Sequence, residues 1–145
     1  MKTTLISLVS SLLLFLSSVP ANSAVFNIAS GDVTGLIAAI NAANANSQDN
    51  VINLAPGTYT LTAIDNSRSA GDANGLPVIT GTITINGGDA ETTIIERVRS
   101  LNAFPRFRIF DVAAGATLTI NQLSISGGVV NTTSSGGAGL RYAHR

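Results

Sequence analysis

The sequence contains no cysteine and no tryptophan, and its one histidine, His144, lies near the C-terminal end. The absence of cysteine excludes disulfides and thiolate chemistry, and a single histidine excludes a metal site built from several histidines. Charged residues make up only 11% of the chain, against roughly 25% in an ordinary globular domain. Acids and bases balance at eight each, so no strong field favours nucleic acid or an anionic membrane. The surface must therefore be covered mainly by Ser, Thr, Asn and Gly.

The first 24 residues have the order of a secretory signal peptide. Lys2 supplies a positive start, Leu5–Leu16 is almost entirely apolar or small, and the small residues Ala21 and Ala24 follow. This apolar run is shorter than the ~20 residues that a membrane-spanning helix needs. We therefore predict a signal peptide over residues 1–24, cleaved after Ala21 or Ala24, and no transmembrane segment. The protein is expected to be exported and to lie outside the cell or on its outer surface.

Residues 25–145 form the predicted folded part, which contains no lysine. Seven arginines against eight acids leave it with a formal net charge of −1. Residues 25–30 are predicted to form a short strand, and Asp32 is suited to cap a helix that follows. The apolar residues after it recur at spacings of three and four, which indicates one apolar helical face; they are Val33, Leu36, Ile37, Ile40 and Ala43. Asn44 and Asn46 are expected to end this helix.

Beyond Asp49 the apolar residues alternate, which predicts short strands separated by Gly and Asn-Gly turns. The predicted strands lie at 51–54, 58–62, 78–79, 82–85, 92–95, 108–112, 117–120 and 123–125, with loops over 65–75 and 97–106. Thr82–Asn86 is repeated as Thr117–Asn121, 35 positions later, as two stacked turns of a solenoid would require. An antiparallel sandwich and a parallel β-helix both fit many short strands. The pattern favours the β-helix, because an amphipathic helix before the first turn would cover its open end.

The segment from Phe26 to Asn46 also resembles the opening of bacterial right-handed parallel β-helix proteins. These include the polymorphic outer membrane protein type and related pectin-lyase-like surface proteins. The resemblance is carried by Gly31-Asp32, by the helical stretch 36–44, by 49–54 and 57–61, and by the later segments 83–87, 108–112 and 118–128. It covers essentially all of residues 26–140 and implies an all-β right-handed parallel β-helix with an N-terminal amphipathic capping helix. Its motifs are structural, so they are nearly silent on function.

In such proteins Gly136–Gly139 would lead into further turns, whereas here only Leu140–Arg145 follows. The resemblance therefore implies a β-helix truncated at its C-terminus, a fragment of a longer protein. An open last turn is expected to make the chain self-associate through that end, or to aggregate if the chain is a degenerate gene product.

The resemblance also suggests where to look for chemistry, because β-helix enzymes that act on acidic polysaccharides combine clustered carboxylates with a basic residue. The candidate acids are Asp89, Glu91, Glu96 and Asp111, and the candidate bases are Arg97, Arg99, Arg106 and Arg108. A catalytic arginine would need its pKa, normally above about 12, to be lowered far. We instead expect Glu96 and its neighbouring arginines to form ordinary surface ion pairs, with Ile109 pointing inward and Arg108 outward.

A calcium site is the other chemistry considered, with Asp65, Asp72 and Asn74 in one loop as its ligands. Their spacing lacks the regular order of a dedicated calcium loop, so no metal or cofactor is predicted. Asn86 and Asn121 occupy equivalent positions of the repeat and are expected to stack as a ladder inside a corner.

The sequence thus predicts a secreted or cell-surface scaffold without catalytic activity, similar to an adhesin module. Its expected partners are a glycan or the surface of a host or neighbouring cell, and not nucleic acid. The alternative is a fragment of a polysaccharide lyase or hydrolase of pectin-lyase-like fold.

Overall fold

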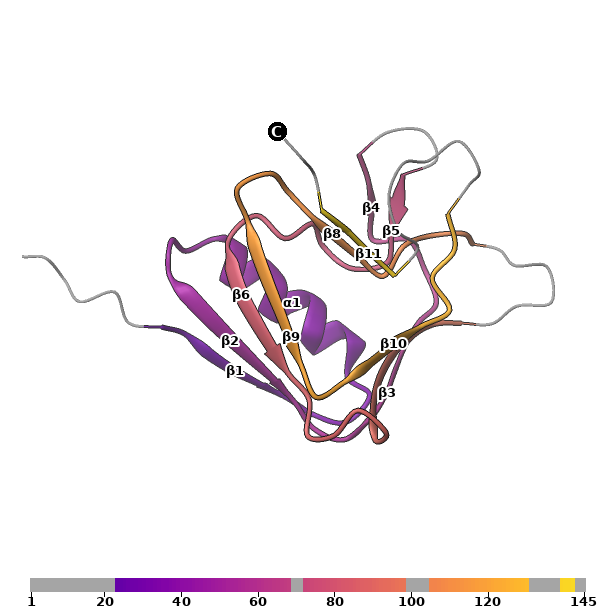
Figure 1. The fold of residues 1–145 in the computed structure, drawn as a ribbon, viewed down its shortest axis with the longest axis horizontal. Helices are drawn as coiled ribbons and strands as arrows, with labels where there is room; N and C mark the ends of the chain where they lie inside the picture. The colour runs from indigo at the N-terminus through magenta and orange to yellow at the C-terminus, as the bar shows by residue number, and fades with distance from the viewer. Residues whose placement is uncertain (1–22, 69–71, 99–104, 131–138, 143–145) are drawn as a thin grey trace, which may run out of the picture.

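The computed structural model of the chain describes residues 23–68, 72–98, 105–130 and 139–142. The predicted signal peptide, except for its last two residues, lies outside the described residues. The described chain is mostly β-strand, arranged in separate parallel sheets, with one α-helix (Figure 1). No helix within these ranges is long and apolar enough to cross a membrane.

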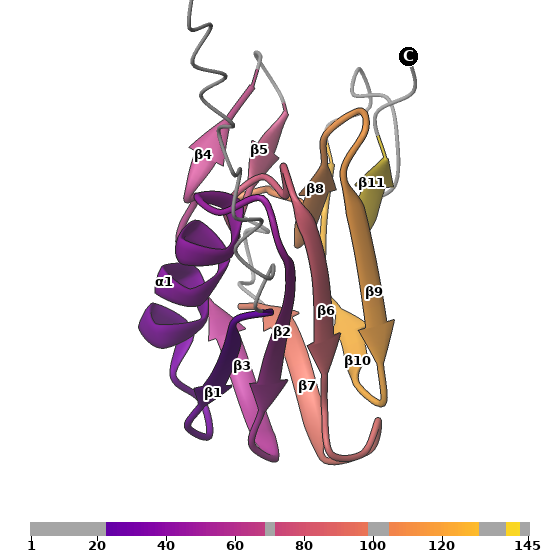
Figure 2. The same cartoon turned by 90° about the vertical axis from the view of Figure 1, so that its left-hand side faces the viewer.

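The strands form three parallel sheets and one small hairpin (Figures 1 and 2). The first sheet contains, in spatial order, β1 (Val25–Ile28), β2 (Asp49–Leu54), β6 (Thr82–Asn86) and β9 (Thr117–Asn121). The second contains β10 (Ser124–Ser126), β7 (Thr93–Arg97) and β3 (Gly57–Leu61), and the third contains β11 (Leu140–Tyr142) and β8 (Phe110–Val112). The hairpin joins β4 (Asn66–Ser67) and β5 (Ala73–Asn74), which are antiparallel.

The repeat found in the sequence corresponds to neighbouring strands. β6 and β9 pair in parallel, with Thr82 opposite Thr117 and Asn86 opposite Asn121. From β2 onward the chain passes through the first sheet and then the second. Isolated parallel bridges place the next segment, 74–79, beside the third sheet. The chain then returns to the first sheet. An antiparallel sandwich is therefore wrong for the described strands.

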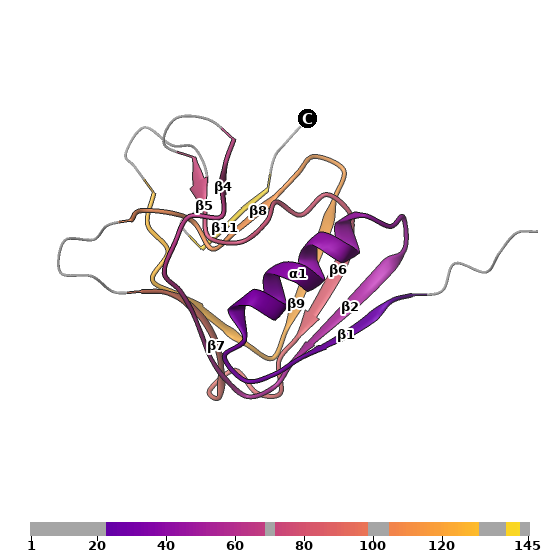
Figure 3. The same cartoon turned by 180° about the vertical axis from the view of Figure 1, so that it is seen from behind.

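The helix α1 (Val33–Asn44) begins and ends where the sequence predicts. The carboxylate of Asp32 accepts a hydrogen bond of 2.8 Å from the backbone N–H of Gly35, which caps the first turn. The buried face consists of Leu36, Ala39, Ile40 and Ala43. Figure 3 shows α1 lying across the space between the sheets, so that this face covers one end of the shared core.

Asn50 ties the C-terminal end of α1 to the first sheet. This side chain is 1% exposed, and its Nδ2 donates to the carbonyl oxygens of Ala43 (3.1 Å) and Gln48 (2.8 Å) and to Oδ1 of Asn46 (2.9 Å). Its Oδ1 accepts from Nδ2 of Asn46 at 3.0 Å. A buried polar side chain of β2 is thus hydrogen-bonded to the last turn of the helix and to the turn that follows it.

The three sheets and α1 share one core. Inward side chains stack across the strands: Ile83 lies opposite Leu118, and Ile52 lies opposite Ile85. The other large buried members are Ile28, Leu36, Ile40, Leu54, Tyr59, Leu61, Leu76, Ile79, Ile95, Phe107, Ile109, Phe110 and Val112. Each such side chain contributes roughly 1.5–3 kcal/mol through burial, so this core, rather than any surface contact, holds the sheets together.

Tyr59 gives the core a pH-dependent element. The side chain is fully buried, and its hydroxyl lies 2.8 Å from the carbonyl oxygen of Ala55 and 3.0 Å from that of Ala29. Burial, together with the negative charge of Asp32, raises the pKa of Tyr59 above its ordinary value of 10.0. The folded state therefore holds the phenol proton more tightly than the unfolded state does.

We expect the free energy of unfolding to fall as the pH rises above about 10, where the unfolded chain can release the Tyr59 proton and the folded chain cannot. Urea unfolding at neutral pH and again in alkaline buffer measures this loss. A Tyr59→Phe variant should lose about 1 kcal/mol at neutral pH and show a smaller alkaline decline. An equal alkaline decline in both proteins would contradict the assignment.

Two parts of the fold differ from the sequence prediction. Leu140–Tyr142, which the sequence suggested only as a trailing end, is strand β11 paired with β8. Every residue from Phe107 to Val112 is buried, whereas a strand with one face on the core would have alternated. The charged side chains of this segment are covered by Asp72, which lies between β4 and β5, and by Arg141 of β11.

Candidate functional site

Three of the charged candidates predicted from sequence, Asp72, Arg108 and Asp111, meet outside the third sheet. We define this group, the charge cluster, by its residues Arg68, Asp72, Asn74, Arg108, Asp111 and Arg141. Parallel pairing brings them together, because Arg141 of β11 lies opposite Asp111 of β8, and Arg108 lies opposite Asn74 of β5. Four separate stretches of the chain therefore contribute to one cluster.

Asp111 is the centre of the charge cluster and is fully buried. Arg141 binds it through two hydrogen bonds, from Nε to Oδ1 at 2.9 Å and from Nη2 to Oδ2 at 2.5 Å. Nη1 of Arg68, whose side chain is 41% exposed, lies 3.5 Å from Oδ2. The bidentate geometry is the strongest arrangement that a carboxylate and a guanidinium can form.

Asp72 is the second acid and bridges two arginines. Its Oδ1 lies 2.8 Å from Nη2 of the fully buried Arg108, and its Oδ2 lies 3.3 Å from Nη1 of Arg141. Arg141 therefore links both acids. Charges buried in this way persist because each has an opposite partner within hydrogen-bond distance.

The pKa of Arg141 is shifted in the direction opposite to that of a general base. The hydrogen bond to Asp111 is the main cause, and it raises the pKa of the guanidinium above its ordinary value, although burial opposes the shift. A base that abstracts a proton near neutral pH needs its pKa lowered toward that pH. Arg141 is thus suited to hold two carboxylates and not to remove a proton.

The three calcium candidates lie close together but are engaged in other contacts. Asp65 is exposed and accepts from Nδ2 of Asn66 at 2.8 Å. Nδ2 of Asn74 donates to Oδ1 of Asn66 at 2.8 Å, while the buried Oδ1 of Asn74 has no hydrogen-bond partner among the described atoms. Asp72 faces two guanidinium groups, which would repel a cation. In the described ranges no three acidic or histidine side chains gather as a metal site would require.

The candidates on β7 lie apart from the charge cluster. Oε1 of Glu96 accepts from the hydroxyl of Thr60 at 3.4 Å. Arg97 is 4% exposed, donates to the carbonyl oxygens of Gly127 (2.7 Å) and Pro105 (3.2 Å), and lies 5.9 Å from the ring centre of Phe107. Arg97 thus joins Pro105, at the end of the loop over 97–106, to Gly127, which follows β10. This role is structural.

The other described candidates lie at the surface. Arg106 is exposed, and Arg99 lies outside the described residues. Oδ1 of Asp89 accepts from the backbone N–H of Glu91 at 2.7 Å, so Asp89 shapes the turn before β7, and Glu91 is exposed.

Two expectations about these side chains are wrong. Arg108 was expected to point to solvent but is fully buried, because the hairpin supplies Asp72 as its partner on that side. Arg97 was expected in a surface ion pair but is buried against backbone carbonyls. Sequence analysis also missed Arg68 and Arg141. No local motif marks them, since Arg141 contacts Asp111 and Asp72 only across 30 and 69 positions.

A second polar feature is the outer face of the first sheet. The predicted stack of Asn86 and Asn121 is confirmed, with 2.9 Å between Nδ2 of Asn121 and Oδ1 of Asn86. It extends to Asn53 and Asn27, through contacts of 3.1 and 3.0 Å. We call these four residues the asparagine ladder; it lies on the solvent side of the sheet rather than inside a corner. Val51, Thr84 and Thr119 form a neighbouring outward row in register.

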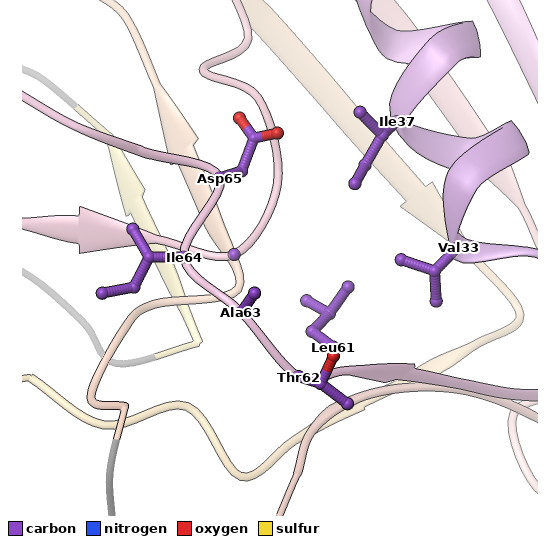
Figure 4. A pocket seen from close by; sticks show the side chains of 8 residues that line it. Val33, Ile37, Leu61, Thr62, Ala63, Ile64 and Asp65 are labelled. Atoms are coloured by element: carbon purple, nitrogen blue, oxygen red, sulfur yellow. The ribbon is translucent and has the colours of Figure 1, made fainter.

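A cavity of about 220 Å³ lies between the first turn of α1 and the segment after β3 (Figure 4). Val33 and Ile37 line it from the helix, and Leu61, Ala63 and Ile64 from the other side. Asp65 is its only charged lining residue. The cavity is mostly apolar and contains none of the arginines of the charge cluster.

Comparison of the chain with protein-family models, with curated proteins and with solved structures found no match.

Proposed function

We propose that residues 25–145 form a right-handed parallel β-helix with α1 as its N-terminal cap. The proposal is supported by the recurring order in which the chain enters the three parallel sheets and by the in-register stacking of inward Ile and Leu side chains. Parallel crossovers within one sheet are right-handed in about 98% of cases. The position of α1 across one end of the core supports its role as a cap.

In this proposal the module is an exported, non-catalytic scaffold of the cell surface or of the secreted fraction. Its long outer face, formed by the asparagine ladder and the neighbouring Thr and Val row, would be presented to a glycan or to another cell. Asn and Thr side chains offer both donors and acceptors to hydroxyl groups without attracting ions. The face is uncharged apart from Asp49 at one end of β2.

The pairing of acids and arginines inside the charge cluster is the observation that best supports a function without catalysis. Asp72 and Asp111, the acids that the fold brings together, are bound by Arg108 and Arg141. A lyase site of the kind considered from the sequence needs carboxylates that can bind calcium and a basic group that can accept a proton. Here the carboxylates and the guanidinium groups neutralise one another, which favours a structural role for the charge cluster.

We expect no cleavage of polygalacturonate by the purified chain, with or without calcium, because the candidate acids and bases are paired. Ultraviolet absorbance of unsaturated products tests for a lyase, and release of reducing ends tests for a hydrolase. The same assays on an Arg141→Lys variant provide a matched control. Product formation that scales with protein concentration and falls in the variant would overturn the scaffold proposal in favour of the enzyme fragment.

Export predicts a defined N-terminus. The hydroxyl of Ser23 donates to the carbonyl oxygen of Asp49, and the carbonyl oxygen of Ala24 accepts from the N–H of Val51 at 2.9 Å. Cleavage after Ala21 keeps both contacts, whereas cleavage after Ala24 removes both. We therefore expect mass spectrometry of the exported chain to show Asn22 as its first residue. A chain that stays inside the cell and begins at Met1 would contradict export.

The prediction of self-association through the end formed by β9, β10 and β11 remains, and light scattering over a range of concentrations measures it directly.

A further inference from the structure

The strand β1 forms one edge of the first sheet, and no described strand pairs with the row of backbone groups on its outer side. The N–H of Val51 donates to the carbonyl oxygen of Ala24, and the N–H of Ala55 donates to that of Ile28. Backbone groups of successive residues in a strand point to opposite sides. The N–H and C=O groups of Val25 and Asn27 therefore point away from β2, and no described strand lies on that side.

A groove runs along this edge between β1 and α1. It has a volume of about 480 Å³ and is lined by Val25–Ile28 on one side and by Gly35, Ala38, Ala39 and Ala42 on the other. None of these side chains is charged. The helix side carries only hydrogen atoms or methyl groups, so a second backbone can approach it closely. Val25, at the rim, is 58% exposed.

We propose that this groove binds one extended polypeptide segment of a partner protein, which adds to the first sheet as a further strand beside β1. Only a peptide backbone supplies donors and acceptors with the spacing of Val25 and Asn27, and edge strands are natural templates for such addition. The small residues of α1 select small or aliphatic side chains, and the neutral lining selects an uncharged segment.

The asparagine ladder fixes the register of the added strand. Its hydrogen bonds all run in one direction, since Nδ2 of each asparagine donates to Oδ1 of the preceding one, ending at Oδ1 of Asn27. Nδ2 of Asn27 makes no hydrogen bond to a described residue and therefore offers a donor to the added strand. An asparagine at the matching position would continue the ladder. The best-fitting segment thus has the pattern of the sheet's own strands, an aliphatic residue followed by asparagine.

The occupant is a single segment rather than a folded second copy, because α1 stands beside the β1 edge. Figure 2 shows α1 on the side of β1 away from β2. A complete sheet from another copy would meet the helix before its strand reached β1. The inference goes beyond the proposed function, since it concerns this edge and does not depend on what the outer face presents.

The test uses the exported chain and a fluorescent peptide with the sequence of residues 116–122, measured by fluorescence anisotropy and amide hydrogen exchange. We expect saturable one-to-one binding and at least tenfold slower exchange of the Asn27 amide. Methylating alternate peptide nitrogens should abolish binding. Ala38→Glu, which places a charge in the groove, should weaken binding at least tenfold, whereas Asn41→Glu on the exposed face of α1 should not.

Three results would overturn the proposal. The first is the absence of binding at millimolar peptide, and the second is binding that Ala38→Glu leaves unchanged. The third is a stable dimer in light scattering whose Asn27 amide is already protected without peptide, which would identify a second copy as the occupant.

Discussion

Replacing Asp111 with asparagine should lower the free energy of unfolding by about 3–5 kcal/mol, the usual cost of removing one partner from a buried ion pair. The side chain keeps its size, so the effect isolates the charge. Arg108, which is fully buried, and Arg141 would be left with Asp72 as the remaining acid of the cluster. Typical domains are stable by 5–15 kcal/mol, so the variant should approach the limit of folding. Urea denaturation followed by circular dichroism measures the loss.

Asp65→Asn is the matched control, because Asp65 is an exposed neighbour of the cluster with one local hydrogen bond. It should change the stability by no more than about 0.5 kcal/mol. A double variant with Arg141→Met should cost less than the sum of the two single changes, since both remove the same contacts. An Asp111→Asn protein as stable as the Asp65→Asn protein would show that the charge cluster does not stabilise the fold.

Replacing Gly87 with alanine should also cost at least about 3 kcal/mol, the upper range for overpacking in a rigid interior. A Cβ atom at this position would lie 2.2 Å from the backbone carbonyl oxygen of Gln122 and 2.9 Å from Cβ of Leu123. Neither atom can move away by a side-chain rotation. Moreover, the N–H of Gly87 donates to the carbonyl oxygen of Asn121 at 2.8 Å, so any shift separates β6 from β9.

The adjacent glycine provides the control for this substitution. A Cβ atom on Gly88 would lie 3.4 Å from Cγ of Pro56, an ordinary van der Waals distance. Gly88→Ala should therefore change the melting temperature by a few degrees at most, while Gly87→Ala should lower it by roughly 10 °C or more. Equal stability of the two variants would show that the turn after β6 is not as tightly packed as described.

The sequence predicted local structure well because the relevant signals are local. Asp32 lies directly before an apolar stripe with helical spacing, and these two features alone set the start of α1. The repeat at Thr82 and Thr117 predicted neighbouring strands, because equal patterns stack best in register. The asparagine ladder was half predicted, since only Asn86 and Asn121 lie in that repeat; Asn27 and Asn53 occupy equivalent positions in strands of different sequence.

The charge cluster could be predicted only in part, because its contacts join residues that are distant in the chain. With Ile109 facing the core, strand geometry puts Arg108 on the outward face, which would be correct for a strand with solvent on that side. Here Asp72 of the β4–β5 hairpin and Arg141 of β11 pair with the charged residues of this segment, which therefore become buried. No residue near Arg108 in the sequence predicts its contact with Asp72, and none near Asp111 predicts its contact with Arg141.

The asparagine ladder also disfavours a shift in strand register that the hydrophobic pattern alone does not oppose. A slip of one residue between neighbouring strands would turn every inward side chain to solvent and is strongly disfavoured. A slip of two residues keeps Ile and Leu facing inward, so the core alone barely opposes it. It would, however, place Asn121 opposite Thr84 and break the carboxamide contacts between β6 and β9. The four aligned carboxamides thus specify the strand register, because the aligned sheet is lower in free energy than the forms shifted by two residues.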